Sequence, residues 1–155
     1  MENVTQRYLS LLEKTIFSIL EGTFEAVAQD HSEATYTVKR TMVDYEINWS
    51  ADATSCYNMV RACTKPYPGA FTYLNGKQCH IWDAALLDTR RFESSFPGRV
   101  AGFWSLDDLK GISVLCGDKR ALVVKRISFN GSDGDISGDE LFSHFQLSTT
   151  LGIRE

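Results

Sequence analysis

Histidine, cysteine and proline are scarce in this sequence of 155 residues, which contains three, four and three of them respectively. The cysteines (Cys56, Cys63, Cys79 and Cys116) show neither the C-x-x-C spacing of a metal knuckle nor the regular spacing of a disulfide framework. Cys79 and His80 are adjacent, so on a strand their side chains point to opposite faces and cannot share a metal ion. We therefore predict four buried thiols in a reducing compartment and no metal site.

Long apolar runs and a basic excess are also missing. No apolar segment approaches the ~20 residues of a membrane-spanning helix, and the first residues lack the basic start of a secretory signal. The 20 acidic residues outnumber the 16 basic ones, which gives a net charge of −4. A nucleic-acid-binding protein normally carries a basic excess. We expect a soluble cytoplasmic protein with no membrane contact and no nucleic-acid partner.

The common signatures of catalysis are absent. The sequence contains no G-x-S-x-G, no G-x-x-x-x-G-K-[ST] and no H-E-x-x-H motif. His31, His80 and His144 lie in three different segments, and no spacing places one of them beside a nucleophile and an orienting carboxylate. We identify no catalytic residue in this chain.

The hydrophobic composition of 43% is that of a globular domain, and its clearest periodicity lies near the N-terminus. Apolar residues recur there at three- and four-residue spacing, which predicts an amphipathic helix over residues 3–21 that ends at Gly22. A stripe this wide needs a partner surface, either in this chain or outside it. The stripe consists of Val4, Tyr8, Leu11, Leu12, Thr15, Ile16, Ile19 and Leu20.

Two further elements are predicted before residue 70. Residues 34–40 alternate and are rich in β-formers, which predicts a short strand. Ser50 is a candidate N-cap for a helix that runs to about Cys63. Pro66 and Pro68 prevent that helix from continuing.

The remainder of the sequence favours β-structure. Asn75-Gly76 suits a type I′ turn between strands over 70–74 and 77–87, and we expect Phe71 and Trp82 to pair across this hairpin. The other expected elements are strands over 99–105, 111–116 and 120–129 and a short helix over 139–146. Five or six short strands with few helices indicate an α+β fold built on a small open barrel or a strongly curved sheet.

The residues from Gln29 to Trp82 resemble the C-terminal part of formyltransferases that use 10-formyltetrahydrofolate. The resemblance rests on ATYTVKRTMVDYEINWS (34–50), YNMVRACTKPYPGAFTYLNGK (57–77) and the strand that ends in Ile81-Trp82. It is strongest to the sugar N-formyltransferases, such as the UDP-4-amino-4-deoxy-L-arabinose formyltransferase. Methionyl-tRNA formyltransferases are similar to a lesser degree.

This resemblance implies an open, OB-like β-barrel with an N-terminal amphipathic helix and a short helix before the barrel. It implies that residues 1–41 are the tail of a catalytic domain and that 42–155 form the C-terminal domain. The family's catalytic Asn, His and Asp and its folate site belong to an upstream domain that no residue here matches. The chain is therefore expected to hold no cofactor and to depend on a catalytic domain in cis or in trans.

The resemblance also suggests substrate-binding residues. In the family, the segment that matches Tyr36 to Trp49 lies near the entrance to the acceptor site. Arg40 is the first candidate for contact with a nucleotide phosphate, because guanidinium groups pair well with phosphate oxygens. Arg61 is a second candidate, against the alternative that it is buried against Asp44 or the proline corner, and Tyr36 is a third.

Three functions remain open from the sequence. The first is an accessory, substrate-side domain of a nucleotide-sugar N-formyltransferase that is inactive alone. The second is a stand-alone, non-catalytic binding or interaction module. The third is a divergent tRNA-formyltransferase tail, which the acidic composition disfavours because phosphate contacts dominate tRNA affinity.

Overall fold

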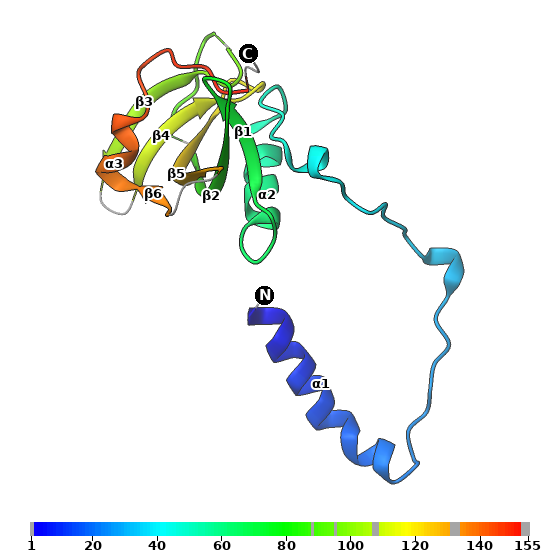
Figure 1. Ribbon diagram of the computed structural model, residues 1–155. Helices are drawn as coiled ribbons and strands as arrows, with labels where there is room; N and C mark the ends of the chain where they lie inside the picture. The colour runs from blue at the N-terminus through cyan, green and yellow to red at the C-terminus, as the bar shows by residue number, and fades with distance from the viewer. Residues whose placement is uncertain (1, 88, 95, 107–108, 131–133, 153–155) are drawn as a thin grey trace. The chain divides into compact units, whose positions relative to one another are not determined.

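The computed structural model describes residues 2–87, 89–94, 96–106, 109–130 and 134–152. It divides the chain into two compact units, Met1–Val38 and Lys39–Glu155, both of which are drawn in Figure 1. In the described part of the chain, no helix is both long enough and apolar enough to cross a membrane.

The first unit contains helix α1, Glu2–Leu20, which confirms the predicted helix to within one residue at each end. Gly22 follows with a φ of 66°, a conformation that glycine adopts at helix C-termini without steric cost. The amide of Thr23 donates to the carbonyl of Ser18 at 2.9 Å and completes the last turn. Most of the apolar stripe is exposed, including Tyr8 and Leu12.

The strand expected over residues 34–40 is wrong. A single 3-10 turn, η1 (His31–Glu33), is followed by chain that joins no described strand. The alternating side chains of Tyr36 and Val38 are 87% and 89% exposed. An alternating pattern describes a half-buried strand only where a neighbouring strand supplies hydrogen bonds and a covered face, and this segment has neither in the described structure.

The second unit begins with the 3-10 turn η2 (Met42–Tyr45) and helix α2 (Ala53–Cys63). Helix α2 ends at Cys63, before Pro66 and Pro68, as predicted, but its N-cap is Asp52 and not the expected Ser50. The Asp52 carboxylate accepts the amide of Ser55 at 2.9 Å, whereas the amide of Ser50 donates to the Asn48 side chain. A carboxylate three residues before the amide is well placed for an N-cap.

The rest of the unit is one antiparallel sheet (Figure 1). Its strand order is β1-β2-β5-β4-β3, and β6 pairs with β5. The elements are β1 (Ala70–Leu74), β2 (Lys77–Leu87), β3 (Val100–Leu106), β4 (Leu109–Leu115), β5 (Ala121–Phe129), β6 (Ile136–Ser137) and α3 (Gly138–Ser143). The predicted hairpin is confirmed, with φ values of 48° at Asn75 and 72° at Gly76, as a type I′ turn requires.

The α+β class is confirmed, but the sheet is not closed into a barrel. Strands β1 and β3 lie at opposite ends of the hydrogen-bonded order, and no ladder between described residues joins them. Both edges are instead covered by irregular chain. The Ile47 amide donates to the Phe71 carbonyl at 2.8 Å on β1, and the Val100 amide of β3 donates to the Thr149 carbonyl at 2.8 Å. Edges protected in this way do not need closure.

Both faces of the sheet bury side chains. The larger cluster lies under α2 and α3 and includes Ile81, Ile112, Leu122 and Leu141, all at most 1% exposed. A smaller cluster covers the other face. It consists of Leu87, Leu115, Ala121 and Val123, with Phe92, Ala101 and Trp104 packed against them.

The expected pairing of Phe71 with Trp82 is wrong. The register places Phe71 opposite His80, and the Trp82 ring stacks on the His80 ring with centroids 5.6 Å apart. Gly69 lies against Trp82, where a Cβ atom would come within 2.7 Å of the indole. The proline corner thus packs directly onto the end of the hairpin, which the sequence alone did not indicate.

Candidate functional site

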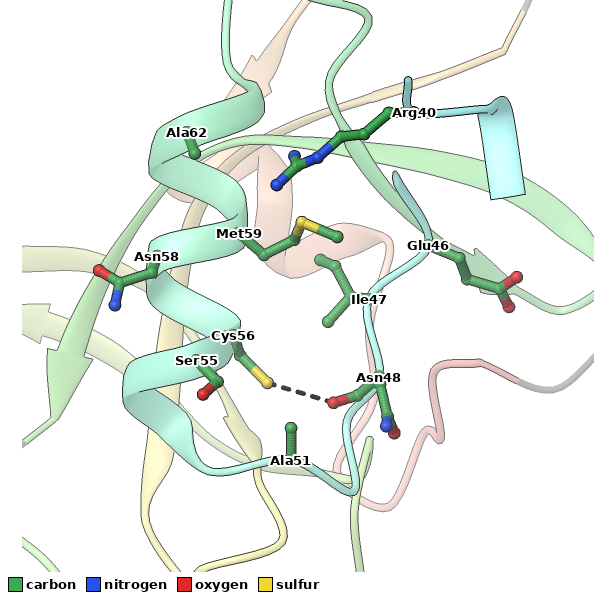
Figure 2. A pocket seen from close by; sticks show the side chains of 10 residues that line it. All are labelled: Arg40, Glu46, Ile47, Asn48, Ala51, Ser55, Cys56, Asn58, Met59 and Ala62. Carbon is green, nitrogen blue, oxygen red and sulfur yellow. Dashed lines mark hydrogen bonds between the residues drawn. The ribbon is translucent and has the colours of Figure 1, made fainter. Parts of the chain in front are cut away.

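A cavity of about 420 Å³ lies between helix α2 and the extended segment 46–51 (Figure 2). One wall comes from the chain that precedes α2, and the other comes from one face of α2. The lining residues are Arg40, Glu46, Ile47, Asn48, Ala51, Ser55, Cys56, Asn58, Met59 and Ala62.

The first wall is held in place at both ends. Asp44 accepts the amide of Thr41 at 2.6 Å and its hydroxyl at 2.9 Å, which closes the η2 turn. These hydrogen bonds hold the pKa of Asp44 below its ordinary value. Farther on, the Trp49 indole donates to the buried Thr72 hydroxyl at 3.0 Å. The segment between them is therefore fixed against β1.

The second wall is one face of α2. Ser55, Asn58, Met59 and Ala62 lie at i, i+3, i+4 and i+7, so they line up along one side of the helix. The opposite side packs into the core through side chains such as that of Val60. The amphipathic pattern that places α2 on the sheet therefore also sets which of its residues face the cavity.

The N-terminal end of α2 is anchored to the turn between β4 and β5. Asp118 accepts the amide of Ala53 at 3.2 Å, and Arg120 donates to Thr54 at 2.9 Å and to Asp118 at 2.6 Å. Burial opposes ionisation of Asp118, but these hydrogen bonds outweigh it and lower its pKa. These hydrogen bonds fix the start of α2 against the turn.

Arg40 supplies the positive charge of the cavity. Its guanidinium extends across the opening toward α2, as Figure 2 shows, and Nη1 donates to the Cys63 sulfur at 3.1 Å. The same guanidinium lies 6.0 Å from the centroid of the Tyr45 ring. The Asp44 carboxylate also interacts with this guanidinium electrostatically. Because a guanidinium carries five N–H donors, Arg40 retains capacity for an anionic group.

The other two candidates lie outside the lining. Arg61 is exposed on α2, where it donates to the Asn58 side chain at 3.1 Å and lies 5.4 Å from the Tyr57 ring centroid. The alternative of a buried Arg61 is therefore wrong. Tyr36 is exposed in the first unit. The structure links Arg61 to the cavity through Asn58, whereas Tyr36 belongs to the first unit and is not among the lining residues.

Three polar lining residues, Asn48, Ser55 and Asn58, were not predicted from the sequence. A signal for two of them was present, since Ser55 and Asn58 lie three residues apart on the polar side of α2. No comparable signal marked Asn48, because its position depends on how the preceding segment folds back on the helix.

The chemistry of the lining suits binding. One guanidinium, one carboxylate (Glu46), two amides and a hydroxyl can orient a small polar ligand with an anionic group. No histidine is among the described residues of the lining, and no cluster of metal-ligating side chains occurs in the described part of the chain. The polar groups of the lining therefore suit recognition of such a ligand.

Residues 40–144 match the family described as formyl transferase, C-terminal domain. A crystal structure of a HypX variant from Aquifex aeolicus is similar in fold, with a TM-score of 0.60 and 19% identity. That likeness covers 92% of this chain but only 23% of the HypX chain, so the present chain spans about a quarter of that structure's length. Because the family match extends over more than half of the sequence, the chain belongs to the family of formyl transferase C-terminal domains.

Proposed function

We propose that this domain is the accessory, acceptor-side part of a cytoplasmic, 10-formyltetrahydrofolate-dependent formyltransferase that acts on a nucleotide sugar. The family match over residues 40–144 carries the proposal. The catalytic residues and the folate belong to a companion domain, in the same chain or in a partner. Residues 1–41 are the tail of that catalytic domain, and 42–155 form the C-terminal domain.

The domain is inactive alone on this proposal. Formyl transfer requires a base beside the acceptor amine and donors for the developing oxyanion. The described lining of the cavity contributes charge and hydrogen bonds but no histidine. On this proposal the companion domain supplies the proton transfer.

Arg40 is proposed to bind the phosphate of the nucleotide sugar. The cavity residues Asn48 and Asn58 would orient the rest of that group, and Arg61 would support the site through its hydrogen bond to Asn58. Tyr36 is a third proposed contact for the nucleotide sugar. A charge-assisted contact from a guanidinium to phosphate is among the stronger hydrogen bonds in proteins.

The activity proposal is tested with the chain alone and with a catalytic formyltransferase domain added. Incubation with 10-formyltetrahydrofolate and a UDP-amino-sugar should yield no formylated product from the chain alone. Product should form when the catalytic domain is present. Turnover by the isolated chain would refute its accessory role.

The binding proposal is tested by calorimetry with a UDP-amino-sugar. Arg40→Ala should weaken binding by about tenfold or more, because it removes a charge-assisted hydrogen bond. The matched control is Arg91→Ala, which removes an exposed arginine outside the cavity lining. Equal affinities for the two variants would assign the phosphate site elsewhere.

An interaction module is the second candidate, and the exposed apolar side chains of α1 favour it. Leu12→Glu should reduce co-purification with a catalytic formyltransferase domain if α1 docks on it, whereas Lys14→Glu, in the same helix, should not. If both variants still co-purify with the catalytic domain, α1 is not part of the interface.

The tRNA-formyltransferase alternative is tested by a gel-shift assay at modest salt. Retardation of initiator tRNA by the chain would support this alternative.

A further inference from the structure

A second hollow lies on the outer strands of the sheet, and its volume is about 210 Å³. Most of its lining comes from β3, one residue comes from β4, and two come from the connection between β2 and β3. The lining residues are Arg90, Phe92, Ala101, Gly102, Phe103, Trp104, Ser105 and Ser113. None of them belongs to the described lining of the cavity beside α2, so this β3 hollow is a separate feature of the surface.

The connection between β2 and β3 is held against the sheet just beyond Arg90. The Phe92 amide donates to the Lys119 carbonyl at 3.0 Å. Phe92 also packs against the smaller buried cluster, which includes Leu115 and Val123. The backbone that carries Arg90 is therefore anchored to the sheet two residues after it.

The floor of the β3 hollow is built from two small residues. Gly102 has no side chain, and its partner across the ladder is Ser113, which is 1% exposed. The Ser113 hydroxyl donates to the Gly102 carbonyl at 3.1 Å, and a Cβ atom at Gly102 would come within 3.3 Å of that hydroxyl oxygen. The two residues leave an open space beside Trp104, which shares a face of β3 with Gly102 because alternate residues of a strand lie on one face.

Arg90 supplies a positive charge at this hollow. Its guanidinium carbon lies 4.8 Å from the centroid of the Trp104 ring, which is within the range of a cation–π contact. No carboxylate in the described part of the chain forms an ion pair with Arg90. A guanidinium carries five N–H donors, so Arg90 can bind an anionic group while it lies over the ring.

The volume of the β3 hollow limits the size of its occupant. An engineered apolar cavity of about 150 Å³ holds one benzene molecule, and pockets for drug-sized ligands start at about 300 Å³. At about 210 Å³, the hollow fits a single ring with one small substituent. Phe92 and Trp104 suit an aromatic ring, and Arg90 suits a negatively charged substituent.

We propose that the β3 hollow binds a small aromatic carboxylate, with its ring against Trp104 and its carboxylate on the Arg90 guanidinium. The chain as a whole carries a net charge of −4, so it does not attract anions in general. Attraction of the carboxylate therefore comes from Arg90 at this one place. The site is independent of Arg40 and of the nucleotide-sugar proposal, because the two linings share no described residue.

The test is a titration of the full, isotope-labelled chain with benzoate, followed through the indole N–H resonances of its three tryptophans. The Trp104 resonance should shift saturably, with a Kd in the millimolar range or below. The indoles of Trp49 and Trp82 are hydrogen bonded to other side chains elsewhere in the fold, so their resonances should stay in place. No saturable shift at Trp104, or a larger shift at either other tryptophan, would overturn the proposal.

Two further probes separate the contribution of the ring from that of the charge. Benzamide has the same ring without the charge, and acetate has the charge without the ring. Each should bind at least about tenfold more weakly than benzoate, because each lacks one of the two contacts. Benzamide binding as tightly as benzoate would show that the carboxylate is not recognised. Acetate binding as tightly would show the same for the ring, and either result contradicts the proposal.

A pair of variants tests the guanidinium. Arg90→Gln should weaken benzoate binding by about tenfold, because it removes the charged partner of the carboxylate. Arg91→Gln is the matched control and should leave the affinity unchanged, since Arg91 is the adjacent exposed arginine and lies outside the lining. Both side chains are exposed, so the fold should tolerate both substitutions. If the two variants bind benzoate equally well, Arg90 does not bind the carboxylate.

Discussion

Helices α1 and α2 are both amphipathic, yet their surroundings differ. The apolar side of α2 is buried against the sheet through Ala53, Cys56 and Val60. The corresponding side of α1 carries exposed side chains such as those of Tyr8 and Leu12. Periodicity therefore predicts the helix and its apolar face, but it does not identify what covers that face.

The two units therefore differ in how much apolar surface they bury. The unit 39–155 has a buried apolar cluster on each side of its sheet, whereas the described apolar side chains of the unit 1–38 lie largely in solvent. Hydrophobic stabilisation scales with the apolar area removed from water. Equivalent substitutions in the two units should therefore have very different effects on the free energy of unfolding.

The largest contrast is expected between two phenylalanines. Phe71 of β1 is 5% exposed, so Phe71→Ala should reduce the free energy of unfolding by about 3–5 kcal/mol. Phe17 of α1 is 69% exposed, so Phe17→Ala should change it by less than about 0.5 kcal/mol. Urea denaturation followed by circular dichroism measures both. Equal destabilisation would mean that α1 has a covering surface within this chain.

A smaller effect is expected from the buried hydrogen bond between Trp49 and Thr72. Thr72→Val removes the acceptor and leaves the Trp49 indole N–H unsatisfied in the core. The cost should be about 1–3 kcal/mol in the same assay. Thr35→Val, in the exposed segment of the first unit, is the control. If the two variants have the same midpoint, the indole has another partner.

Two glycines with positive φ, one in each unit, should respond differently to the same substitution. Gly76→Val introduces a β-branched residue at φ 72° in the hairpin turn, and this should cost about 1–2 kcal/mol. Gly22→Val is strained at φ 66°, but it lies beyond the end of α1. It should reduce helix content without shifting the midpoint of sheet unfolding, as read from tryptophan fluorescence. A shift in that midpoint for Gly22→Val would couple the two units.

The smallest effect is a pH dependence at Asp118. Its pKa is lowered in the folded state, so its carboxylate stabilises the fold above the ordinary value of about 3.9. That stability is lost as the pH falls through the lower, folded-state pKa. The urea midpoint of the unchanged chain should therefore decrease below about pH 4, and the midpoint of Asp118→Asn should decrease less steeply. If the two midpoints depend on pH in the same way, the Asp118 carboxylate does not stabilise the start of α2.

Much of the fold followed from local patterns. The β1–β2 hairpin was predicted from Asn75-Gly76 because only a few residue types adopt the positive φ values of a type I′ turn. Helix α2 and its end followed from periodicity and from the prolines. The predictions of a strand over 34–40 and of Ser50 as an N-cap were wrong. A strand requires a neighbouring strand, and an N-cap requires an aligned backbone amide. A short stretch of sequence shows neither.

The candidate site was predictable only in part. Arg40 was singled out through the family resemblance, and the structure places it at a cavity. Its role in phosphate binding stays a prediction, as do those of Arg61 and Tyr36. Asn48 was not predicted, because its place in the lining depends on how the segment before α2 folds back on that helix.

The sequence by itself determined the helices, the hairpin, the α+β class and the likeness to formyltransferase C-terminal domains. These depend on residue spacing and on backbone preferences that act over a few positions. Only the tertiary structure decided that the sheet remains open, that its edges are covered by 46–47 and 148–151, and which side chains meet in the cavity. Those outcomes depend on packing between distant segments, whose free energy no short stretch of sequence contains.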